Sequence, residues 1–201
     1  MLVNASKFRV AVITTAALTI GACSKNDNSA MDTTAASSAM APADTAAAPF
    51  ADFAWSDANI VALLDEANMA DSAAGSIAAT KGTSSAVRDF AKMMMRDHHT
   101  LRAQGQALAK KLNVTPEPPA GDNSVSDSQK NLDMLNSTAK GKDFDKAYVD
   151  AEVDYHKAVL ETATKAMNAA QNTELKNLIQ KAAPLLQAHL DRAQSIQRNL
   201  Q

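Results

Sequence analysis

The sequence of 201 residues is poor in cysteine, glycine, proline and aromatic residues. It contains one cysteine, six glycines and six prolines, and only 4% of its residues are aromatic. A single cysteine excludes an intrachain disulfide and any zinc or iron–sulfur site built from cysteines. The scarcity of aromatic residues and turn glycines argues against β-sandwiches and barrels. Because the formal net charge is -2, we expect no nucleic-acid partner.

The single cysteine stands where a bacterial lipoprotein carries one. Residues 1–22 have the order of a signal peptide, with positive residues ahead of an apolar run over 10–20 that is too short to span a bilayer. The run ends in the letters IGAC at 20–23, which resemble the lipobox of bacterial lipoproteins. The resemblance implies cleavage before Cys23, lipidation of its thiol and a membrane as partner. The alternative is an incidental cysteine in an ordinary secretory signal.

The same resemblance implies a location in the bacterial cell envelope. Ser24 follows the cysteine in place of aspartate, which in a Gram-negative cell indicates the outer membrane, facing the periplasm. Residues 23–52 are mostly small or polar and hold too little apolar area to offset the entropy of ordering them. We therefore expect a signal peptide over 1–22, a flexible tether over 23–52 that starts at the lipidated cysteine, and a folded domain over 53–201.

The apolar residues of this domain recur with a helical period. The pattern predicts four long helices and one short helix, at Ser56–Thr80, Ser84–Leu112, Ser126–Ala139, Asp143–Ala170 and Thr173–Leu200. Each long helix would measure about 40 Å. Four helices of matched length predict an all-α fold, a ferritin-like four-helix bundle with one long middle connection that contains the short extra helix. A simple up-down bundle stays open as the alternative.

Polar side chains stand at positions of these helices that should face the core. Asp71 lies on the apolar stripe of the first helix, and one histidine lies on an inward row of each other long helix: His98, His156 and His189. Residue counting from the turns puts the histidines at similar depth and Asp71 about 7–8 Å from the level of His98. Since an unpaired buried polar group costs about 1–3 kcal/mol, these side chains must satisfy one another, water or a ligand.

Three further residues could join such a cluster. Asp97 adjoins His98, while Glu152 and Met94 stand four residues before His156 and His98. Imidazole with carboxylate suits Zn, Fe, Mn or Cu, and a thioether favours Cu(I). The sequence therefore indicates a transition-metal site made of Asp71, His98, His156 and His189, with Asp97, Glu152 and Met94 as additional candidates. The alternative is a metal-free, hydrogen-bonded polar core, with Glu152 solvated and Met94 packed among apolar residues.

Four stretches of the chain together resemble a known family. They are SAVRDFA at 85–91, MMRDH at 94–98, FDKAY at 144–148 with His156 after it, and PLLQAHL at 184–190. In this order they resemble the bacterial family called domain of unknown function 4142, over roughly residues 53–198. The resemblance implies a ferritin-like helical fold and export, with a glutamate common where this chain has Asp71. Since the chain lacks the Glu-x-x-His motifs of di-iron bundles, iron storage and ferroxidase activity are not carried over.

The sequence leaves three functions in competition. The first is an envelope lipoprotein that binds a transition metal for metal handling or protection against stress. The second is a non-catalytic structural or adaptor lipoprotein, with a protein partner that the sequence does not identify. An enzyme is the least favoured, because the chain shows no glycine-rich phosphate loop and no serine–histidine–aspartate order.

Overall fold

The computed structural model describes residues 55–200, and this part of the chain is all-α, with five helices and no strand. The helices are α1 (Asp57–Lys81), α2 (Ser85–Leu112), α3 (Ser124–Ser137), α4 (Lys142–Ala169) and α5 (Thr173–Asn199). Each predicted helix is present, and its ends lie within two residues of the predicted ones. Within the described range, no helix has the length and apolar character needed to cross a membrane. The predicted signal peptide, the tether and Cys23 lie outside the described residues.

Short-range hydrogen bonds fix where two of the helices begin. Ser56 Oγ accepts from the backbone N–H of Asn59 at 3.1 Å, and Asn59 Oδ1 accepts from the backbone N–H of Ser56 at 3.0 Å. This capping box opens α1. The side-chain oxygen of Asn172 accepts from the backbone N–H of Glu174 at 2.8 Å and so caps α5. α5 then runs through Pro184 as one helix to Asn199.

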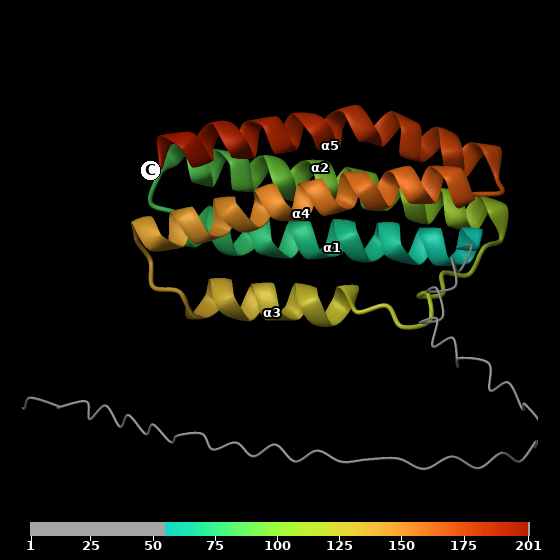
Figure 1. Ribbon diagram of the computed structural model, residues 1–201, viewed down its shortest axis with the longest axis horizontal. Helices are drawn as coiled ribbons and strands as arrows, with labels where there is room; N and C mark the ends of the chain where they lie inside the picture. Colours follow the sequence, from blue (N-terminus) through green and yellow to red (C-terminus); the bar gives the residue numbers. More distant parts are fainter. Residues whose placement is uncertain (1–54, 201) are drawn as a thin grey trace, which may run out of the picture. The chain divides into compact units, whose positions relative to one another are not determined.

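The four long helices run side by side, with α3 along the outside (Figure 1). α1 packs against α2 and α4, and α5 packs against the same two helices. α3 contacts α1 and α4. Tight turns join α1 to α2 and α4 to α5, so the helices of each pair are antiparallel.

The long connection from α2 to α4 returns along α1. Near the first turn of α1, the backbone N–H of Glu117 donates to the carbonyl of Ala58 at 3.2 Å. In the last turn of α1, Lys81 Nζ donates to the carbonyl of Leu135 in α3 at 2.7 Å. α3 therefore runs in the same direction as α1 (Figure 1). The connection spans the length of the long helices, so α4 begins at the same end as α2 and runs parallel to it.

Two separate clusters of buried apolar side chains form the core. The larger is built around Phe90, Phe144 and Tyr148, and the smaller around Ile60 and Leu175. Each long helix contributes to both clusters. Each long helix carries one buried polar residue between its apolar residues of one cluster and its apolar residues of the other. These polar residues are Asp71, His98, His156 and His189. A polar layer therefore divides the hydrophobic core.

The close approach of α1 to α2 depends on Gly75. A Cβ atom at this position would lie 2.9 Å from the carbonyl oxygen of Ala91, a backbone atom that cannot easily move. We expect Gly75→Ala to lower the free energy of unfolding by about 1–3 kcal/mol, measured by urea denaturation. Gly105→Ala is the matched control, since a Cβ at Gly105 meets nothing within 4 Å. It should raise stability by about 0.5–1 kcal/mol, and equal effects of the two substitutions would contradict the packing argument.

Candidate metal centre

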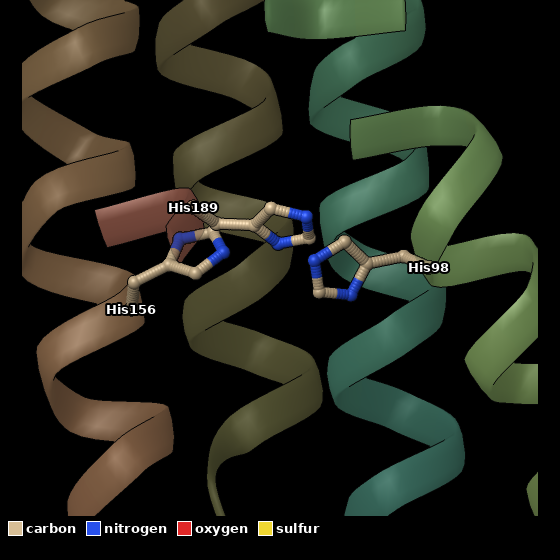
Figure 2. Close-up of side chains that lie close together, drawn as sticks. All are labelled: His98, His156 and His189. Atoms are coloured by element: carbon tan, nitrogen blue, oxygen red, sulfur yellow. The ribbon is translucent and has the colours of Figure 1, made fainter. Parts of the chain in front are cut away.

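Three histidines from three helices meet in the polar layer. His98 comes from α2, His156 from α4 and His189 from α5, and Figure 2 shows the three rings close together. Their ring centroids are 5.6 Å (His98–His156), 5.2 Å (His98–His189) and 5.4 Å (His156–His189) apart. The exposed fractions of these residues are 2%, 0% and 1%. The rings therefore face one another in a space that bulk water does not reach.

The hydrogen bond of His98 fixes which of its nitrogens carries the proton. Nδ1 lies 2.9 Å from Asn68 Oδ1. The amide of Asn68 is oriented by its own nitrogen, which donates to the carbonyl of Leu64 at 2.6 Å. Because Asn68 Oδ1 can only accept, His98 donates through Nδ1. In the neutral ring, Nε2 is then a lone-pair nitrogen directed at the other histidines.

The other two histidines follow the same pattern. His156 Nδ1 lies 3.0 Å from the carbonyl oxygen of Glu152, to which it donates, so Nε2 carries the lone pair. His189 Nε2 lies 3.1 Å from Asp97 Oδ2, to which it donates, so Nδ1 carries the lone pair. Metal-binding histidines are commonly held this way, with the outer nitrogen bound to a carbonyl or carboxylate. One ring nitrogen from each of the three histidines lies within 4.8 Å of one from each of the other two.

Asp71 from α1 completes the cluster. The offset between the levels of Asp71 and His98 that residue counting predicted is therefore wrong. Asp71 Oδ2 lies 3.1 Å from His98 Nε2 and 3.7 Å from His156 Nε2. Residue counting failed because it measured both positions from Gly82, whereas α2 begins only at Ser85. Side chains also lean toward the N-terminus of their own helix, which in antiparallel helices brings these two side chains together.

The carboxylate of Glu152 faces Asp71 in the same layer. Glu152 is 3% exposed, so it is not a solvated residue of the helix surface. Ligand atoms of Asp71, Glu152 and His156 lie within 4.8 Å of one another and form a second group that could hold a metal ion. His156 belongs to both groups.

The cluster is short of hydrogen-bond partners. Seven of its buried atoms find none within the described residues: Asp71 Oδ1, Asp71 Oδ2, His98 Nε2, Tyr148 OH, Glu152 Oε2, His156 Nε2 and His189 Nδ1. The 3.1 Å contact between Asp71 and His98 is close enough for a hydrogen bond but is not aligned for one. Each unsatisfied buried group costs about 1–3 kcal/mol. A cation among these lone pairs would remove most of that penalty.

Burial sets the protonation of the cluster. Desolvation, with the neighbouring His189, lowers the pKa of His98 from its ordinary value of 6.5 to about 3. Burial also lowers the pKa of His156. Both imidazoles are therefore neutral at pH 7, the form that binds metals. Burial raises the pKa of Asp71 and of Glu152, and the nearby Asp71 carboxylate adds to the effect on Glu152.

Asp97 and Met94, the two remaining candidates from the sequence, lie outside the group of converging side chains. Asp97 stands behind His189, with its side chain 15% exposed, and orients the ring from outside the cluster. Burial acts to raise the pKa of Asp97, but hydrogen bonds from Arg96 and His189 outweigh it and lower that pKa. Met94 is fully buried and packs in the larger hydrophobic cluster. The fourth histidine, His99, is exposed.

Two residues of the cluster were absent from the candidates that sequence analysis gave. Asn68 sets the tautomer of His98, and Tyr148 places an unpartnered hydroxyl among the described residues of this layer. Asn68 stands three residues before Asp71 on the same face of α1, a spacing that could have identified it. Tyr148 gave no such signal, because a tyrosine on an apolar stripe is typical of an ordinary core.

The comparisons with known proteins identify a family. Neither the curated proteins nor the solved structures gave a match to this chain. The model of the family described as Domain of unknown function (DUF4142) matches residues 39–196. This range contains all five helices up to the last turn of α5 and every residue of the polar cluster. The chain therefore belongs to the Domain of unknown function (DUF4142) family.

Proposed function

We propose that this protein is an envelope lipoprotein that binds one transition-metal ion between Asp71, His98, His156 and His189. The observation that carries the proposal is the convergence of three histidine rings. In each ring one nitrogen is already hydrogen-bonded to a residue outside the group of three, which leaves the other nitrogen with its lone pair. Since the buried carboxylate of Asp71 adjoins two of them, the donor set is three imidazoles and one carboxylate. Such a set suits Zn, Fe, Mn or Cu.

The surrounding residues support this assignment. Asn68, Asp97 and the carbonyl of Glu152 hold the three rings by their outer nitrogens, which fixes tautomer and orientation before an ion arrives. The charge of Asp71 offsets part of the charge of a divalent ion. The carboxylate of Glu152 lies beside Asp71 and His156 as a further ligand or as an acceptor for a bound water.

The path of the chain supports a ferritin-like four-helix bundle as the scaffold. α1 and α2 form one antiparallel pair, α4 and α5 form the other, and the connection with α3 crosses from one end to the other. Metal sites in such bundles are built from side chains on facing helices, as the four ligands proposed here are. The scaffold and donor set fit a role in metal handling or in protection against metal-dependent stress.

The decisive experiment measures the metal that the protein has bound in the cell before purification. The chain is purified from the periplasm without a histidine tag, and its metal content is determined by elemental analysis. We expect about one transition-metal ion per chain. Thermal unfolding is then followed with Zn, Cu, Fe and Mn added to the metal-free protein, because an ion at 100 times its Kd stabilises the native state by about 2.7 kcal/mol. Metal-free protein with unchanged thermal stability would refute the proposal.

One observation favours a second function, a structural lipoprotein with a metal-free polar core. Burial raises the pKa of Asp71, and a proton on Asp71 could be donated to His98 Nε2 after a small rotation, since the two atoms are 3.1 Å apart. That proton serves only one of the three lone-pair nitrogens. The metal-free core therefore needs further donors at His156 Nε2 and His189 Nδ1, both unpartnered among the described residues.

The lipid anchor is tested separately at Cys23. We expect the wild-type chain to partition with membranes and Cys23→Ser to appear in the soluble periplasmic fraction, because thioether-linked lipid requires the thiol. Fractionation with immunoblotting measures the distribution, and mass spectrometry measures the added acyl mass. Ser24→Asp is the matched control, since it keeps the thiol and should still be lipidated. Equal membrane retention of Cys23→Ser and the wild type would show that Cys23 is not the anchor.

A further inference from the structure

A cavity of about 440 Å³ opens beside the carboxylate side of the candidate metal centre. It lies between α1, α4 and the first half of α3, with Asp122 from the segment before α3. Asp71 and Glu152 contribute to its lining, and their side chains are buried, with oxygen atoms that find no partner among the described residues. The cavity therefore reaches the unsatisfied carboxylates of the polar layer.

The lining of this cavity is rich in acidic side chains. Among the described residues that line it, five are acidic and none is basic: Glu66, Asp71, Asp122, Asp127 and Glu152. Asp127 is paired with the exposed Lys130 at 2.6 Å, so four carboxylates remain without a basic partner in the cavity. A cleft with charge of one sign and low-dielectric walls concentrates ions of the opposite sign.

Two of the acidic residues are held together away from the polar layer. Ser124 Oγ lies 2.5 Å from Glu66 Oε2 and 2.7 Å from Asp122 Oδ2. A hydroxyl has one hydrogen, so it cannot be donated fully to both carboxylates. The side chains of Glu66 and Asp122 therefore present acceptor oxygens at a point of the lining separate from Asp71 and Glu152.

A second, smaller cavity reaches the histidine side of the cluster. Its volume is about 40 Å³, and His98, Gly105 and Ala182 are among the residues that line it. In contrast to the larger cavity, no acidic residue of the described chain lines it. Tyr155 lines both cavities, and its hydroxyl donates to the carbonyl of Ala67 at 3.0 Å. The wall between the two cavities is thus tied to α1.

We propose that the acidic cavity is the loading site of the metal centre: a hydrated divalent cation binds first to its carboxylates and reaches the histidines past Asp71 and Glu152. This inference rests on the proposed metal-binding function. The second cavity is too small and too apolar to strip a hydrated cation of its water, because no carboxylate of the described residues faces it.

Association kinetics with Co²⁺ test the route, with the visible absorption of the ion recorded by stopped flow on the full mature chain. Ala70→Phe and Ala151→Phe place an aromatic ring in the acidic cavity. We expect association and dissociation to slow together by about ten-fold, because the ion then requires a local opening of the helices, while Kd stays within about two-fold. Ala188→Phe is the matched control, since Ala188 adjoins a ligand but is exposed and lines neither cavity.

Charge variants test the same route without filling the cavity. Glu66→Gln with Asp122→Asn should slow association about ten-fold at low salt and weaken its dependence on ionic strength. The matched control is Asp154→Asn with Glu161→Gln, which removes equal charge from exposed positions outside the cavity. If Co²⁺ binds and neither set of cavity variants changes the association rate relative to its control, the loading site is refuted and the metal centre stands. If Co²⁺ does not bind the wild type, the metal centre itself fails.

Discussion

Replacing His156 by alanine is expected to reduce metal affinity at least about 100-fold, the largest effect that any single substitution should have on binding. Loss of an outer-shell partner alone commonly costs 10–100-fold, and His156 contributes a nitrogen to the ion itself. It is also the residue shared by the two groups that could hold an ion. Equilibrium titration with Zn²⁺ against a competing chelator measures the affinity, and circular dichroism shows whether the variant remains helical.

His99→Ala is the matched control for this substitution. His99 adjoins His98 on α2 but is exposed, so its removal should leave the affinity unchanged. Adventitious binding to surface histidines would instead weaken in His99→Ala and not in His156→Ala, because His156 is buried. Equal affinities of His156→Ala and His99→Ala would exclude the proposed centre.

Asp71→Asn is expected to separate the metal centre from a metal-free polar core. Burying a carboxylate without a partner is costly, and an amide of the same shape carries no charge and offers an N–H to His98 Nε2, 3.1 Å from Asp71 Oδ2. We expect the metal-free variant to be more stable than the wild type by about 1–2 kcal/mol. The same substitution should weaken metal binding about 100-fold, since the amide supplies no charge to the ion.

Urea denaturation without metal and chelator competition with metal measure the two effects of Asp71→Asn. Asp89→Asn is the control, because the side chain of Asp89 is 73% exposed on α2, and both quantities should stay unchanged. If Asp71→Asn lowers the stability of the metal-free chain, Asp71 is a supporting member of a polar core. A gain in the stability of the metal-free chain together with a loss of metal affinity would show that Asp71 serves metal binding and not stability.

The helices could be predicted from the sequence because their signals are local. Ser56 and Asn172 cap their helices through bonds within three residues, and apolar spacing determines which face is buried. Asp71 and the three histidines of the polar cluster could also be predicted, since a polar side chain on the apolar stripe of a helix faces the core. What the sequence could not supply was the offset between helices, which depends on where each helix begins after its turn and on which way the side chains lean.

The residues around the histidines show a second limit of prediction from the sequence. From the sequence, Glu152 could be either a ligand in the core or a solvated residue of α4. Only the packing of α1 against α4 shows that it faces Asp71. The tautomers of the three rings depend on partners from different elements: an amide of α1 for His98, a carboxylate of α2 for His189 and a carbonyl of α4 for His156. Spacing along one helix cannot reveal such contacts between helices.

The polar layer that divides the core also has a mechanical consequence. Each long helix is anchored by apolar contacts at both ends and crosses, at its middle, a level where those contacts are interrupted. Native-state hydrogen exchange would distinguish the two ends as separate units of opening while the layer holds no ion. Four ligands from α1, α2, α4 and α5 around one cation would cross-link all the long helices at that level and make both ends open together.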